Sequence, residues 1–143
     1  MSYEERGQWV YVVAIVLTYI AYVAVIAGQV TQTPLAEVEF APAMVVAIGP
    51  GIALAIVGRI AVEIVARIRE PTGSHDTDVR DRDIGRFGEY FAGTVLGIGM
   101  VVPFALTLAE FDYFWIANTM YLAFVLSALI GSVVKLVAYR RGL

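Results

Sequence analysis

The stretch that decides the fold is residues 115–141, which read WIANTMYLAFVLSALIGSVVKLVAYRR. Its charges are Lys135 near the end and the two closing arginines. A helix rises about 1.5 Å per residue, so residues 115–139 are long enough to cross about 30 Å of hydrocarbon. An isolated strand in lipid would leave backbone N–H and C=O groups unpaired. The stretch therefore predicts a transmembrane helix over 115–139.

Three more apolar runs precede it, at residues 9–28, 42–68 and 89–108. Pro42 suits the first turn of a helix, where its missing N–H breaks no bond. A signal peptide is the alternative for the first run. That run is too long for a typical signal peptide, however, and the preceding Glu4-Glu5-Arg6 is not a basic leader. We therefore predict an all-α, polytopic membrane four-helix bundle that forms a single transmembrane domain.

The composition agrees with lipid as the solvent. Of 143 residues, 59% are hydrophobic and 16% are charged, and the mean hydropathy is +0.76. A soluble domain of this size could not bury so much apolar surface. The chain has no cysteine and one histidine, His75, so neither a thiolate metal site nor a histidine cluster can form. We expect no metal, no cofactor and no nucleic-acid partner.

The basic residues predict the topology. Segments 29–41 and 109–114 contain acidic residues but no Lys or Arg. Of the ten Lys and Arg residues, all but Arg59 fall before the first run, around residues 67–86, or at the end of the fourth run. Short loops rich in Lys and Arg stay in the cytoplasm. We therefore expect a multi-pass protein of the plasma (inner) membrane with both termini cytoplasmic.

An internal repeat is suggested by residues 35–40, LAEVEF, and residues 108–113, LAEFDY. The same register of 73 residues pairs Gly58 with Gly131. The pattern predicts two tandem helical hairpins of equal orientation, related by an axis along the membrane normal. The alternative is chance similarity between apolar helices of the same composition.

Small residues recur at four-residue spacing, which lets membrane helices approach closely. These stripes are Ala43, Ala47, Gly51 and Ala55 in the second run, Gly93 and Gly97 in the third, and Ala123, Ser127 and Gly131 in the fourth. They predict packing within the bundle or between copies, and we expect a homodimer. Pro50 and Pro103 predict two kinks, which either frame a site or are ordinary bends.

Arg59 and Glu63 form an opposite-charge pair inside the second run, four residues apart and hence on one helix face. A charge at this depth either marks a functional site or extends toward the interface. Tyr19 and Asn118 are polar residues in the first and fourth runs. The four residues are a candidate intramembrane polar site, although Tyr19 and Asn118 are also suited to interhelical hydrogen bonds.

The segment 69–88 is predicted to be a cytoplasmic loop that interacts with a protein partner. Its candidate interaction residues are Asp78, Arg80, Asp81, Arg82 and Asp83. The interleaved arginines oppose metal binding by these aspartates. An alternative is that Asp76 or Asp78 caps a helix that runs on into the third span.

Residues 78–84, DVRDRDI, residues 114–118, FWIAN, and residues 137–142, VAYRRG, resemble an actinobacterial family of small four-helix integral membrane proteins without an assigned function. The likeness is specific in the second half of the chain and looser in the first. The resemblance implies a fold and a membrane location, and no activity.

No catalytic motif is present in the sequence, so we do not expect an enzyme. The preferred hypothesis is a non-enzymatic membrane protein that acts by association, as a scaffold, accessory subunit or regulator, through its charged cytoplasmic face. The alternative is a small dimeric transporter or channel that uses the region of Arg59 and Glu63 and the kinked helices.

Overall fold

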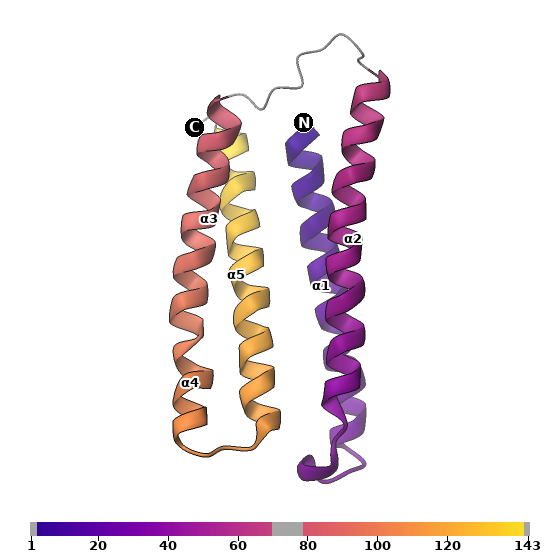
Figure 1. Ribbon diagram of the computed structural model, residues 1–143, viewed down its shortest axis with the longest axis vertical. Helices are drawn as coiled ribbons and strands as arrows, with labels where there is room; N and C mark the ends of the chain where they lie inside the picture. The colour runs from indigo at the N-terminus through magenta and orange to yellow at the C-terminus, as the bar shows by residue number, and fades with distance from the viewer. Residues whose placement is uncertain (1–2, 70–78, 142–143) are drawn as a thin grey trace.

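The computed structural model describes residues 3–69 and 79–141 (Figure 1). Within these ranges the regular structure is helical, with no strand. The elements are α1 (Tyr3–Val30), the 3₁₀ helix η1 (Leu35–Glu37), α2 (Phe40–Arg69), α3 (Val79–Gly99), α4 (Val101–Leu108) and α5 (Tyr113–Arg141).

Four spans in the described chain are long and apolar enough to cross a membrane. They are Gly7–Val30, Phe40–Gly58, Val79–Leu108 and Tyr113–Arg141, so α3 and α4 together make the third span. The predicted all-α chain with four membrane-length helices is confirmed. Large apolar side chains such as Val45 and Ile98 point outward and are exposed, as lipid contact requires.

The helices lie side by side along one direction (Figure 1). α1 packs against α2, and α3 and α4 pack against α5, with the most extensive contact between α3 and α5. α1 also contacts α5 and thereby joins the two pairs, while the main partner of α2 in the described ranges is α1. The start of α1, the end of α2, the start of α3 and the end of α5 lie at one end of the molecule (Figure 1). We call it the basic end, after Arg80, Arg82, Arg86, Arg140 and Arg141.

The third span is interrupted between Gly99 and Val101, three residues before Pro103. Proline has no N–H to donate to the carbonyl four residues back, and its ring crowds that carbonyl, which here belongs to Gly99. Pro103 is fully buried, and a Cβ atom on Gly99 would lie 2.9 Å from the Cβ atom of Ala123. The break therefore coincides with a close approach of the third span to α5. α2, in contrast, continues through Pro50.

The third span begins earlier than predicted. Residues 79–88 belong to α3, so the second half of the predicted loop over 69–88 is helical, as in the alternative of a helix that runs on into the third span. The reason is tertiary packing: Ile84 is 3% exposed and Gly88, one turn later on the same face, is also buried. This apolar face holds a charged segment in the helix. The proposed capping residues Asp76 and Asp78 lie outside the described residues.

The two acidic hexapeptides differ in structure. α2 begins at Phe40 and α5 begins at Tyr113, which matches the register of 73 residues. Before α2, however, residues 35–37 form η1 and Val38 is buried. Before α5, the end of α4 is closed by Glu110 with φ of 56°, and Phe111 N–H donates to the Leu106 carbonyl at 3.0 Å, as in a Schellman cap. The internal repeat therefore stays a prediction.

Candidate functional site

Tyr22 and Asn118 form a hydrogen bond between α1 and α5. The Tyr22 hydroxyl donates to Asn118 Oδ1 at 2.7 Å, and Asn118 Nδ2 donates to the Phe114 carbonyl of its own helix at 2.8 Å. Tyr22 is 3% exposed. Asn118 is half-buried, and both polar side chains find a partner in the apolar bundle.

Two ring contacts extend this pair into a cluster. The ring of Tyr121 lies 5.4 Å from that of Tyr19 and 5.1 Å from that of Tyr22, both edge to face. Such geometry aligns the positive edge of one ring with the negative face of the next. We call Tyr19, Tyr22, Asn118 and Tyr121 the tyrosine cluster. It offers no charged acid, base or nucleophile, and its arrangement suits helix–helix adhesion.

The four residues predicted as one intramembrane site differ in the depth of their backbones. Gly51 in α2 faces Thr18 in α1, where a Cβ atom would lie 3.8 Å from Thr18 Oγ1. Arg59 follows Gly51 by two turns, so its backbone is about 12 Å nearer the basic end than this contact. Tyr19, next to Thr18, belongs with Asn118 to the tyrosine cluster. The side chains of Arg59 and Glu63 lie outside the described residues.

The stripe on α5 packs against α3. Ser127 Oγ donates to the Ala92 carbonyl at 2.7 Å. A Cβ atom on Gly131 would lie 2.8 Å from the Ala92 Cβ atom and 3.1 Å from the Gly88 carbonyl oxygen. Gly88 and Ala92 are therefore the α3 side of this interface. Sequence reasoning missed them, although their four-residue spacing is the same signal that singled out Gly93 and Gly97.

Gly93 and Gly97 lie on the other face of α3. Both are exposed, and a Cβ atom on either would meet no atom within 4 Å. Among the described residues of one chain, neither glycine packs against another helix. Their face is open for lipid or for a second copy.

The charged start of α3 is mostly exposed. Arg80, Arg82 and Asp83 are exposed, Asp81 is half-buried, and Asp78 lies outside the described residues. Ten residues after the start of α3, the Glu89 Oε1 atom lies 3.8 Å from Lys135 Nζ of α5. In residues 3–69 and 79–141, no cluster of acidic residues or histidine has the geometry to hold a metal ion.

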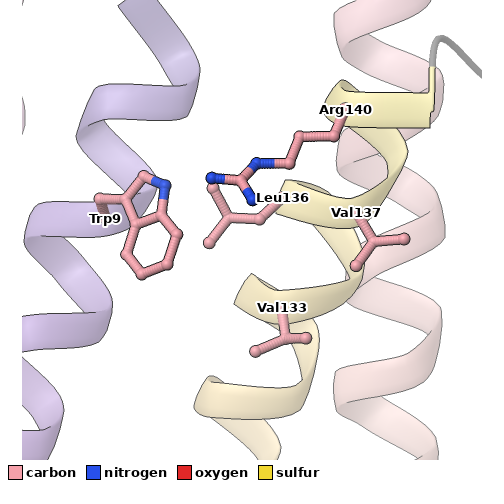
Figure 2. Close-up of a pocket in the computed structure, with 5 residues that line it drawn as sticks. All are labelled: Trp9, Val133, Leu136, Val137 and Arg140. Carbon is pink, nitrogen blue, oxygen red and sulfur yellow. The ribbon is translucent and has the colours of Figure 1, made fainter. Parts of the chain in front are cut away.

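A second ion pair joins α1 to α5 at the basic end. Glu5 is 8% exposed, and its Oε1 atom lies 3.5 Å from Arg140 Nε. The Arg140 Cζ atom also lies 5.8 Å from the centre of the Trp9 ring, within range of a cation–π interaction. Figure 2 shows Arg140 reaching from α5 toward Trp9 on α1. From the sequence alone, Glu5 is considered only as part of Glu4-Glu5-Arg6 before the first run, but its four-residue spacing from Trp9 places both on one helix face.

Compared with protein-family models, curated proteins and solved structures, the chain matches none of them.

Proposed function

We propose that this chain is a non-enzymatic integral membrane protein that acts by association through the charged start of α3. The observation that carries the proposal is that residues 79–88 are a helix continuous with a membrane span. Its exposed charges include Arg82, Asp83 and Arg86. A partner that binds these side chains meets an ordered surface.

Packing on α5 explains why this surface is ordered. Ile84 and Gly88 are buried, and a Cβ atom on Gly88 would collide with the side chain of Lys135. The charged first turns of α3 are thus ordered because the face with Ile84 and Gly88 packs against α5. A surface ordered in advance loses less conformational entropy on binding, which favours association.

In this proposal the protein lies in the plasma (inner) membrane and both of its termini are cytoplasmic. The clustering of basic residues at one end supports it, since Lys and Arg in short loops stay cytoplasmic. The antiparallel pairs α1–α2 and α3/α4–α5 support an origin as two tandem hairpins. The resemblance to the actinobacterial four-helix family agrees with the same placement.

A homodimer is part of the proposal. The exposed face of α3 with Gly93 and Gly97 supports it, because small residues let two backbones approach where lipid supplies no hydrophobic drive. The partner that meets the charged start of α3 is then a separate, cytoplasmic protein.

The alternative, a small dimeric transporter or channel, draws on the break in the third span, because discontinuous helices often surround transport sites. Pro103 at this break is fully buried and the tyrosine cluster satisfies its own hydrogen bond between helices. Both features favour adhesion over a conducting path.

A site-specific photocrosslinker separates the two functions. Placed at Arg82 in living cells, it should give a discrete product larger than the protein itself, whereas the same group at exposed Asp112 at the opposite end should not. Arg86→Glu, one turn away, should weaken the product from position 82. If position 82 gives no product and the protein carries ions or solutes across proteoliposome membranes, the association proposal is rejected in favour of the transporter or channel.

A further inference from the structure

We propose that the groove between α1 and α5 at the basic end binds an anionic phospholipid, with the phosphate at Arg140 and one acyl chain along Trp9, Val133 and Val137. The inference goes beyond association through α3 and is independent of which partner α3 meets. It rests on the proposed membrane placement, in which the four apolar helices span a bilayer and the basic end is cytoplasmic.

The groove has an apolar lining with a charged side chain, Arg140, at one end, which suits an acyl chain attached to an anionic headgroup. Trp9, Val133, Leu136, Val137 and Arg140 line it, with a volume of about 170 Å³ (Figure 2). Leu136 is buried between the helices, while Val133 and Val137 are 49% and 41% exposed. The groove is therefore open to lipid along its length. Val133 precedes Arg140 by seven residues, or about 10 Å, which is most of the roughly 15 Å depth of one leaflet.

Two contacts position the guanidinium at the mouth of the groove. Arg140 Nε faces buried Glu5 at 3.5 Å, and Cζ lies 5.8 Å from the Trp9 ring centre. The Arg140 side chain is 63% exposed, so the guanidinium is open to a ligand at the mouth of the groove. A guanidinium offers parallel N–H donors that match two oxygens of a phosphate.

The surrounding charges select an anionic headgroup over a zwitterionic one. Arg141 follows Arg140 at the same helix end and is exposed, whereas Glu5 is buried and already faces Arg140. A choline or ethanolamine group would bring a cation beside two arginines and meet no accessible carboxylate from Glu5. Basic residues at the cytoplasmic surface are also where anionic lipids collect, and tryptophan prefers this interfacial depth.

Native mass spectrometry of the full-length protein tests the site. The protein is released from mixed micelles that contain phosphatidylglycerol and phosphatidylcholine of identical acyl chains in equal amounts. Phosphatidylglycerol should be retained preferentially, and Arg140→Gln should lower its retention about tenfold, the value of one charge-assisted hydrogen bond. Arg141→Gln removes the same charge one residue away and should have a clearly smaller effect.

A second variant tests the acyl-chain part of the groove while Arg140 and Glu5 stay in place. Val133→Phe fills the groove and should lower phosphatidylglycerol retention, while Ile98→Phe, on an exposed face of α3, should not. Arg140→Gln could impair folding because Glu5 loses this partner. In that case the double variant Glu5→Gln/Arg140→Gln is used instead of the single variant, and it should show the same loss of phosphatidylglycerol.

Three results would overturn the proposal. They are equal retention of the two lipids, an equal loss of phosphatidylglycerol in Arg140→Gln and Arg141→Gln, or unchanged phosphatidylglycerol retention in Val133→Phe. Displacement of the lipid by excess inorganic phosphate would reduce the site to an anion site without an acyl chain. Crosslinking from Arg82 should be the same in all these variants, so failure here leaves the association proposal untouched.

Discussion

The hydrogen bond between Tyr22 and Asn118 is the contact at residue scale that best explains why α1 stays on α5. Lipid tails are as apolar as the side chains of the helices, so burial alone gives little drive for association in a membrane. A buried hydroxyl that finds an amide oxygen, with Tyr121 packed edge to face against its ring, supplies both an oriented bond and dense packing. Tyr19 adds a ring contact to Tyr121 on the same helix pair.

A double-mutant cycle on Tyr22→Phe and Asn118→Ala should give a coupling free energy of about 0.6 to 1.7 kcal/mol, the range of interhelical hydrogen bonds in membranes. The free energy of unfolding in mixed micelles is the measured quantity. Tyr19→Phe is the matched control, because its contact with Tyr121 is through the ring and should survive. Additive effects of Tyr22→Phe and Asn118→Ala would mean that the hydrogen bond contributes nothing to stability.

At the scale of elements, α3 presents small residues on two faces and uses one of them inside the chain. Gly88 and Ala92 face Ser127 and Gly131 of α5, while Gly93 and Gly97 point away. The sequence pattern predicts close packing of α3 but cannot choose between the faces, because both carry the same four-residue spacing. The choice depends on what α5 offers, namely the Ser127 hydroxyl that bonds the Ala92 carbonyl.

Gly131→Ala should therefore lower the free energy of unfolding by about 1 to 3 kcal/mol, the usual cost of overpacking, because its new Cβ atom would lie 2.8 Å from the Ala92 Cβ atom. Gly97→Ala adds the same methyl group where no atom lies within 4 Å and should leave the stability of the monomer unchanged or slightly raised. Reversible unfolding of both variants in micelles measures the difference. Equal destabilisation would contradict the assignment of the α3 faces.

The larger variant Gly97→Leu extends this comparison to the dimer. It should weaken a crosslinked dimer in membranes while leaving the unfolding of the monomer intact, since the added side chain meets only lipid or a second copy. A dimer that persists in Gly97→Leu would place self-association on another face.

At the scale of the whole molecule, the sequence predicts best the features that depend on consecutive residues, namely the four helical spans. Run lengths and hydropathy give four spans, and their bounds differ from the structure mainly at residues 79–88. There, the aspartates allow either a loop or a capped helix, and the burial of Ile84 against α5 is what places the charged segment in α3. The contact of Glu5 with Arg140 joins residues at opposite ends of the chain, so no short-range pattern points to it.

The topology is the property of the whole molecule that is open to the most direct test. Because the chain has no cysteine, single-cysteine variants report one site each. Thr33→Cys and Asp112→Cys lie in the connections at the end opposite the basic end, where no Lys or Arg holds the chain in the cytoplasm. Both should react with a membrane-impermeant thiol reagent in intact cells. His75→Cys and Arg82→Cys should react only after the cells are permeabilised, and reaction of either in intact cells would invert the predicted orientation.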